Sequence, residues 1–573
     1  MPLFLSHVSR LLANAPGLIL AFGLLLGVSG RATADPLHAR IDQAIEASLG
    51  GAAAPPASDA EFVRRVYLDL IGRIPSAGQA REYSADTAAD KRSRLIDKLL
   101  DSPDFARRMQ YVFDVMLMER RSSNSIPATQ WQAYLFESFL ANKPFDQLAR
   151  EILGASGDAL RPAARFYVDR GGETNLLTRD VGRLFLGMDL QCAQCHDHPL
   201  VDDYEQKDYY GIFAYLNRSF VFKDAKKKKS FFAEKGEGEV AFKSVFDSTV
   251  DEKRFRPRLP GGKMLTEPSF AKGQEYFVKP AKNVRPFPRF SRRAQLAVAM
   301  TDGSNTDFNE NITNRLWALV MGRGLVHPVG WRNSDNPASH PELLKELGRE
   351  FAAMKYDVKA FIRQLVLTRA YQRSSEIPES MDPELAEPQR YAVGQLKPLS
   401  AEQFAWSLMS ATGVHGAALA SEQGRAGADP RLSDIFNLDG KRRNLRDQIV
   451  EAAVYARLRG SVGQFAKLYG GAEGEPEGDF QASVHQALFF SNGSQIRSWL
   501  SPSGDNLMGR LIKMQDPRQR ADELYVSILS REPTEEERLE VVEFLLRQAD
   551  DPNTGLHEIA WALLGSSEYR LNH

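Results

Sequence analysis

The sequence predicts a mainly α, multi-helical protein of two domains, with a small antiparallel β insertion between them. First, apolar residues recur at spacings of three and four on both sides of the middle of the chain. Second, short alternating stretches such as GEVAFKSVF occur between residues 219 and 290, separated by proline and glycine signals as in RPRLPGGKM. Third, the composition is ordinary, with 43% hydrophobic and 26% charged residues in 573, which suits globular domains with sizeable cores.

These patterns divide the chain into four expected segments. We expect a signal peptide over 1–34, an N-terminal helical domain with a cysteine motif over 35–218, a β-rich insertion over 219–290, and a C-terminal helical domain over 291–573. Amphipathic spacing predicts a helix over Thr178–Gln191 that runs directly into the cysteine motif.

Helix start signals recur along the chain. Ser102 followed by Pro103 is typical of an N-cap and a first helical position. Capping boxes are expected at three pairs of residues, Ser339 with Glu342, Ser400 with Gln403, and Thr534 with Glu537. Residues 375–388 and 460–478 are expected to be connecting loops.

The N-terminus has the pattern of an export signal. Arg10 is followed by the apolar run Gly17–Gly30, and Ala32-Thr33-Ala34 fits a small-x-small cleavage site. The run is shorter than the roughly 20 residues that span a bilayer, although an uncleaved anchor is an alternative. We therefore expect an exported, periplasmic or extracytoplasmic protein that is not an integral membrane protein after cleavage.

The charge balance argues against a nucleic-acid partner. The 73 lysines and arginines nearly equal the 74 aspartates and glutamates, which leaves a net charge of −1. A nucleic-acid-binding protein needs a basic excess focused on one face, and the sequence does not provide one.

Both cysteines of the chain lie in the stretch QCAQCHDHP, Gln191–Pro199. Cys-x-x-Cys-His is the attachment signature of c-type haem, because two thiols one turn apart can each add to a haem vinyl group. Cys192 and Cys195 would form the thioethers, and His196 would be the proximal iron ligand. The motif predicts one covalent haem c, and such attachment outside the cytoplasm agrees with the expected export.

Two other interpretations of the motif remain open. Cys192 and Cys195 have the spacing of a redox-active disulfide, although a thioredoxin-like βαβ context is missing. A zinc site would need Cys192, Cys195 and His198, with a fourth ligand from the distant His327 or His340. In the haem interpretation the distal ligand must come from elsewhere, with Met188, His327 and His340 as candidates.

The loop-like stretch RGLVHPVGWRNSDNPASHP, Arg323–Pro341, supplies further candidates. Its polar residues with a candidate role at a haem pocket are His327, Arg332, Asp335 and His340. Arg315 and Arg332 are candidates for contact with haem propionates, because the guanidinium fork suits carboxylates. Four residues are instead expected in packing or ion pairs, namely Asp69, Asp114, Asn314 and Trp317.

Long strings of the sequence resemble the exported planctomycete cytochrome-like family, in which two domains of unknown function occur in tandem. The N-terminal, PSCyt-type resemblance rests on EFVRRVYLDLIGRIPS and LFLGMDLQCAQCHDHPLVDDYEQKDYYGIFAYL, and the C-terminal, PSD-type resemblance on NRLWALVMGRGLVHPVGWRNSDNPASHPELLKELGREF. The family is named for its Cys-x-x-Cys-His signature, which continues here as Asp197-His198-Pro199. The resemblance implies a cytochrome-like function and a pathway shared with exported sulfatase-like proteins, such as polysaccharide breakdown.

Three functions are consistent with the sequence. The first is an exported haem c protein in electron transfer with a redox partner, or in a haem-dependent oxidation. The second is a metal-dependent or pocket-based enzyme of polysaccharide breakdown, in which the cysteine motif is structural. The third is an interaction protein of the cell envelope.

Overall fold

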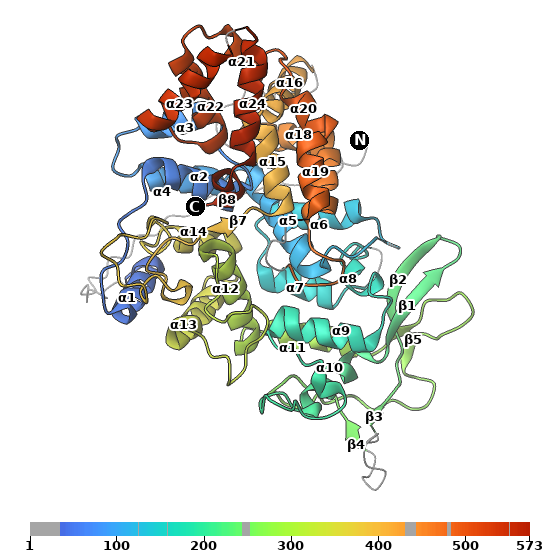
Figure 1. The fold of residues 1–573 in the computed structure, drawn as a ribbon. Coiled ribbons are helices and arrows are strands. Elements are labelled where there is room, and N and C mark those ends of the chain that lie inside the picture. The colour runs from blue at the N-terminus through green and yellow to red at the C-terminus, as the bar shows by residue number, and fades with distance from the viewer. Residues whose placement is uncertain are drawn as a thin grey trace, which may run out of the picture. The chain divides into compact units, whose positions relative to one another are not determined.

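Helices make up most of the computed structural model, which describes residues 35–123, 125–156, 159–242, 253–429, 443–477, 483–548 and 550–573. The predicted mainly α fold with small antiparallel sheets is confirmed (Figure 1). The expected signal peptide, 1–34, lies outside the described residues. The chain divides into two units, Met1–Pro36 and Leu37–His573, and every element described below belongs to the second unit.

The first part of this unit is helical. Its elements are α1 (Leu37–Leu49), α2 (Asp59–Ile71), α3 (Ala77–Ala85), α4 (Lys91–Leu100), α5 (Pro103–Met118), α6 (Ala128–Leu140), α7 (Phe145–Leu153), α8 (Arg165–Val168), α9 (Thr174–Val181), the π-helical turn η1 (Gly182–Leu186), the 3-10 turn η2 (Cys192–Gln194) and α10 (Gln206–Leu216). The predicted start of α5 is confirmed, because the Ser102 hydroxyl accepts the N–H of Phe105 and Pro103 occupies the first turn.

The helix expected over Thr178–Gln191 ends earlier than predicted. After α9 and η1 the chain stops being helical at Gly187, which has a φ of 74°. A Cβ at Gly187 would lie 2.9 Å from Asn311 Oδ1, so the position requires glycine for its conformation and for its space. The cysteine motif therefore lies in a separate loop and not on the end of a helix.

Short antiparallel hairpins follow, as predicted for the insertion. The strands are β1 (Ser219–Asp224) with β2 (Lys229–Glu234), β3 (Val240–Phe242) with β4 (Lys253–Phe255), and β5 (Tyr276–Val278) with β6 (Phe287–Pro288). In the first hairpin Ser219 pairs with Glu234, and Phe232 of β2 stacks on Tyr167 with ring centroids 4.3 Å apart. This stacking fixes the hairpin to the helical core.

The second helical part completes the chain. Its elements are α11 (Arg292–Thr301), α12 (Thr306–Met321), α13 (Pro341–Ala353), α14 (Val358–Val366), the 3-10 turn η3 (Pro388–Arg390), β7 (Lys397–Pro398), α15 (Ala401–Ala411), α16 (Val414–Ala428), α18 (Arg443–Tyr469), α19 (Val484–Asn492), α20 (Ser494–Trp499), α21 (Leu507–Lys513), α22 (Pro517–Leu529), α23 (Glu535–Arg547), α24 (Pro552–Gly565), α25 (Ser567–Arg570) and β8 (Leu571–Asn572). β8 pairs with β7 and ties the C-terminus to the middle of the chain. None of the helices in the described ranges has both the length and the apolar composition of a bilayer-spanning segment.

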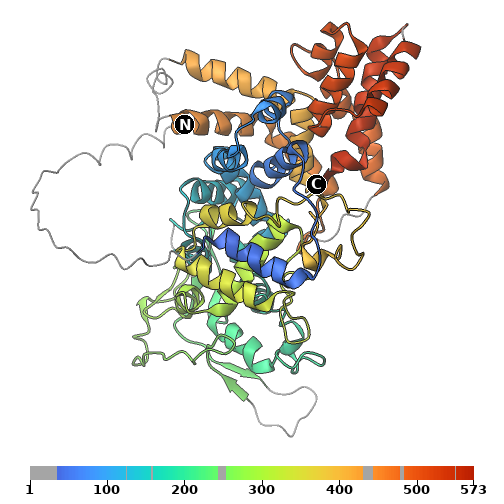
Figure 2. The same cartoon turned by 90° about the vertical axis from the view of Figure 1, so that its left-hand side faces the viewer.

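Two clusters of buried apolar side chains form the core. The first extends from α1 to Val393 and includes the fully buried Trp131 and Trp317. The second joins the helices from α15 onward with Leu68 and Ile74 from the N-terminal part. Figures 1 and 2 show α22–α24 at the opposite end of the molecule from the hairpins.

Two local predictions are wrong. The capping box at Ser339 does not form, because His340 occupies the N-cap of α13 without a side-chain cap bond. The loop predicted over 460–478 is helical as far as Tyr469, since α18 runs through Gly460. The capping boxes at Ser400 and Thr534 are confirmed.

Candidate functional site

The loop that carries the cysteines begins at Gly187, where two distant segments hold the chain. Asn311 of α12 donates from Nδ2 to the carbonyl of Leu184 at 2.8 Å. The Arg332 N–H donates to the Gly187 carbonyl at 2.8 Å. The start of the loop is therefore fixed by residues more than 100 positions away in the sequence.

Cys192 and Cys195 lie at the two ends of one 3-10 turn. The Cys195 N–H donates to the Cys192 carbonyl at 3.3 Å, and Ala193 between them is fully buried. Both thiols are exposed and neither is in a disulfide. The turn thus buries Ala193, while the cysteines on either side of it are exposed.

Two side chains of α10 donate hydrogen bonds to the backbone of this turn. Tyr210 donates its hydroxyl to the Gln194 carbonyl at 3.0 Å, and Gln206 donates from Nε2 to the Cys195 carbonyl at 3.0 Å. Burial, together with the neighbouring Cys195, raises the pKa of the Tyr210 hydroxyl. Tyr210 and Gln206 thus both hold the backbone of the motif through side-chain donors.

His196 is exposed and has a defined tautomer. Its Nδ1 lies 2.6 Å from the carbonyl oxygen of Asp197. A carbonyl oxygen only accepts, so Nδ1 carries the proton and the lone pair of the neutral ring is on Nε2. A histidine that ligates a metal usually donates its other N–H to a carbonyl or carboxylate, and His196 has this arrangement.

The residues Asp197-His198-Pro199, which directly follow the Cys-x-x-Cys-His signature, form a second turn. The Asp197 carboxylate accepts the N–H of Gln206, the first residue of α10, at 2.7 Å. The His198 N–H donates to the Tyr204 carbonyl at 2.8 Å, and His198 Nδ1 accepts the N–H of Leu200 at 3.2 Å. The His198 lone pair is used within the loop, which gives this histidine a structural role in shaping the turn.

The stretch Arg323–Pro341 packs against this loop. Tyr204 donates its hydroxyl to the Arg332 carbonyl at 2.7 Å, and the Ser334 N–H donates to the Asp203 carboxylate at 2.5 Å. A cavity of about 420 Å³ lies at this junction and is lined in part by Met188, Tyr204 and Arg332. The cysteine loop and the stretch Arg323–Pro341, which both hold candidate site residues, are therefore neighbours in the fold.

The individual polar residues of that stretch have other contacts. Arg332 pairs with Asp307 and Glu310 of α12. His327 and Asp335 are exposed. His340 Nε2 lies 2.8 Å from the Ser48 hydroxyl on α1, and burial lowers the pKa of the His340 ring.

Arg315 and the predicted structural residues lie within the helices. Arg315 donates to the Arg183 carbonyl at 2.8 Å, and burial lowers its pKa to about 9. Asn314 bonds both backbone groups of Val326, and Trp317 packs edge-on against Tyr391. Both aspartates are in ion pairs as expected, Asp69 with Lys397 and Asp114 with Arg165.

In the described ranges, no three histidine, cysteine, aspartate or glutamate side chains come together in an arrangement that could hold a metal ion. Cys192 and Cys195 lie at the two ends of one turn without a disulfide and His196 follows directly, which is the residue set of the Cys-x-x-Cys-His signature.

The comparison with known families matches two regions of the chain. Residues 40–220 match PSCyt2, a protein of unknown function (DUF1549), and residues 292–545 match PSD1, a protein of unknown function (DUF1553). No curated protein and no solved structure gives a significant match to the chain.

Proposed function

The chain belongs to the proteins that carry DUF1549 and DUF1553 in tandem, and we propose that it is an exported protein that binds one haem c for extracytoplasmic electron transfer. Cys192 and Cys195 would carry the thioether bonds, and His196 would be the proximal ligand. Once bound, haem would supply a one-electron redox centre.

The observation that carries the proposal is the joint presentation of these three groups. Cys192 and Cys195 are both exposed on a single turn and are not joined in a disulfide. The Asp197 carbonyl orients the His196 ring and leaves its lone pair on Nε2. Gln206 and Tyr210 hold the turn by its carbonyl groups, so the chain itself preorganises the three attachment points.

The exposure of the turn also fits electron transfer better than oxidation of a small substrate. A group attached at exposed thiols lies at the surface, where a partner protein can approach it directly. A haem-dependent oxidation would need a substrate cavity above the iron, and the 420 Å³ cavity near Met188 is lined by Arg332 and Tyr204 rather than by the cysteines.

A reversible Cys192–Cys195 disulfide is the second candidate, because both thiols are free and lie three residues apart on an exposed turn. The two candidates differ in what they need from His196. A dithiol centre works without this imidazole, whereas a haem site uses it as an iron ligand.

The test is expression of the full chain with cytochrome c maturation machinery. We expect a red protein that retains haem stain on a denaturing gel, with one haem per chain in the pyridine haemochrome spectrum. Cys192→Ala with Cys195→Ala should abolish the stain, while His485→Ala, on an exposed position of α19, should retain it. A colourless wild-type protein whose two thiols titrate as a reversible disulfide would replace the proposal with the second candidate.

The variant His196→Ala distinguishes the covalent attachment of haem to the cysteines from the ligation of the haem iron by the histidine. This variant keeps both thiols, so we expect covalent haem with an altered visible spectrum. A spectrum identical to that of the wild type would remove His196 as the proximal ligand.

A further inference from the structure

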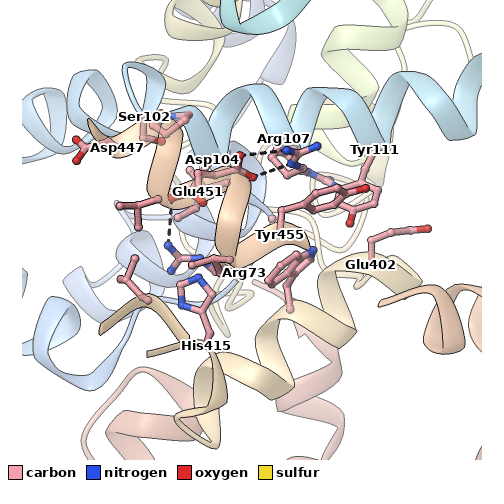
Figure 3. A pocket seen from close by; sticks show the side chains of 18 of the residues that line it. Arg73, Ser102, Asp104, Arg107, Tyr111, Glu402, His415, Asp447, Glu451 and Tyr455 are labelled. Atoms are coloured by element: carbon pink, nitrogen blue, oxygen red, sulfur yellow. Dashed lines mark hydrogen bonds and ion pairs between the residues drawn. The ribbon is translucent and has the colours of Figure 1, made fainter. Parts of the chain in front are cut away.

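A separate pocket of about 180 Å³ lies between the two matched regions (Figure 3). α5 and the residues after α2 form one side, and α15, α16 and α18 form the other. Figure 3 shows the side chains of Arg73, His415 and Tyr455 at this pocket, which come from the segment after α2, from α16 and from α18. Ligand sites often form at such junctions between domains.

Most charged side chains at the pocket are already paired. The pairs are Arg73 with Asp104 at 3.3 Å, Arg107 with Glu451 at 2.7 Å, Glu402 with Arg120 at 2.8 Å, and Asp447 with Arg446 at 3.4 Å. Each of these pairs contains one cation and one anion. Arg120 and Arg446 lie outside the pocket lining, which itself holds three arginines (Arg73, Arg107 and Arg108) and four carboxylates (Asp104, Glu402, Asp447 and Glu451).

Arg108 is the arginine of this lining that has no ion-pair partner among the described residues. It is 8% exposed and lines the pocket. Within the described residues its guanidinium has no hydrogen-bond acceptor, and Nε is fully buried. The carboxylates that act on it electrostatically are Asp69 and Glu402, which are bonded to Lys397 and Arg120. A buried guanidinium without an acceptor is costly, so the site favours an acceptor brought by a ligand.

The backbone at Gly72 makes room for this arginine. Gly72 ends α2 with a φ of 75°, and a Cβ there would lie 3.0 Å from Arg108 Cδ. The left-handed conformation and the close approach both require glycine. The end of α2 is thus shaped around the Arg108 side chain.

The rest of the wall is mainly apolar. Trp406, Leu419 and Val450 line the pocket, and the Trp406 ring meets the edge of His415 with centroids 6.0 Å apart. Burial, reinforced by Arg73, holds the pKa of His415 well below its usual value, so the ring is neutral at pH 7. A neutral imidazole offers a single donor and a single acceptor.

We propose that this pocket binds a small monocarboxylate with an apolar body, whose carboxylate accepts hydrogen bonds from the Arg108 guanidinium. A guanidinium without a hydrogen-bond acceptor presents parallel N–H donors, which match the two oxygens of a carboxylate. The apolar part of the wall, with Trp406, Leu419 and Val450, suits an apolar ligand body. A volume of 180 Å³, the space of about six waters, limits the ligand to the size of a small aromatic or branched acid.

Benzoate and its neutral isostere benzamide are the probes. In isothermal titration calorimetry of the full chain, we expect benzoate to bind with one site per chain and at least about tenfold more tightly than benzamide. Arg108→Gln should weaken benzoate binding about tenfold or more and abolish the preference. Arg94→Gln, at an exposed ion pair on α4, should bind benzoate as the wild type does.

Leu419→Trp provides a second test that keeps Arg108. The larger side chain extends from α16 and fills the pocket, so benzoate binding should be lost. A thermal unfolding midpoint close to that of the wild type shows that the variant is folded. A crystal grown with benzoate should place its carboxylate against Arg108. Equal affinity for benzoate and benzamide, a pocket that holds water or chloride only, or unchanged benzoate binding in Arg108→Gln would overturn the proposal.

Discussion

Arg107 of α5 and Glu451 of α18 form a two-point ion pair, with Nε to Oε1 at 2.7 Å and Nη2 to Oε2 at 3.0 Å. The pair joins the two matched regions of the chain, and both side chains are about 90% buried. The Arg107 guanidinium also lies between the rings of Phe136 and Tyr455, at 3.8 and 3.6 Å from their centroids. This contact fastens the N-terminal helices to the C-terminal ones.

Glu451→Ala should be strongly destabilising, because it leaves the Arg107 charge buried without a partner. We expect a loss of about 3–5 kcal/mol in the free energy of unfolding, measured by urea denaturation. Glu342→Ala, which removes an exposed partner of Lys345, should leave the midpoint nearly unchanged. Equal midpoints for Glu451→Ala and the wild type would show that α5 and α18 do not depend on this pair.

Arg64 should anchor the C-terminus. It is fully buried and donates to the carbonyls of Tyr569 at 2.8 Å and Leu571 at 3.3 Å. Arg64→Met leaves these carbonyls without a donor, and we expect a loss on the order of 3 kcal/mol together with faster amide exchange in α25. Arg81→Met removes a half-exposed arginine instead and should affect the exchange of α25 very little.

Stability should fall as the pH drops below about 6.5. The folded chain keeps the His415 ring neutral, because burial holds its pKa well below the ordinary histidine value of about 6.5, whereas the unfolded chain binds a proton there. The unfolded state therefore binds more protons in acid, and the contribution of His415 to stability is present above pH 6.5 and lost below it. His573, whose pKa burial lowers to about 4, acts in the same direction.

His415→Gln tests this dependence. The variant should lose less stability between pH 7 and pH 5 than the wild type, measured as thermal midpoints at both values. His485→Gln, at an exposed site on α19, serves as the control. Parallel pH profiles for His415→Gln and the wild type would rule out His415 as a source of the slope.

Asp197 should stabilise the start of α10, since its carboxylate accepts the first N–H of the helix. Asp197→Ala removes this acceptor and should cost about 1 kcal/mol, as loss of a cap usually does. Asp197→Asn keeps an acceptor oxygen and should cost less. Both values come from urea denaturation of the reduced chain, and a larger cost for Asn than for Ala would exclude the capping role.

The sequence was sufficient where the determinants of structure are local. Ser102 with Pro103 and the capping boxes at Ser400 and Thr534 appear in the fold as predicted. It failed at Gly460, where glycine suggested a loop inside α18. The buried residues Val454, Leu458, Val462 and Phe465 recur at helical spacing through that glycine. Their packing outweighs the low helix propensity of a single glycine.

The sequence does not predict which residues contact each other when they are far apart along the chain. The cysteine motif was evident as a local pattern, but Gln206 and Asn311, which hold its loop, carry no signal of that role. The sequence also contains no signal of the pocket at Arg108, because the helices that line it are far apart along the chain. Arg107 of α5 and Glu451 of α18, which both line the pocket, are 344 residues apart. Periodicity identifies which face of a helix is buried, but it contains no information on which other helix covers that face.

The central claim is that Cys192 and Cys195 carry one haem, and peptide mass spectrometry tests it most directly. The full chain is produced with cytochrome c maturation machinery, digested, and the peptide that contains both cysteines is weighed. The account predicts a mass increase of one haem on that peptide, and none in Cys192→Ala with Cys195→Ala. An unmodified peptide from haem-replete cells, with both thiols free or joined as a disulfide, would contradict it.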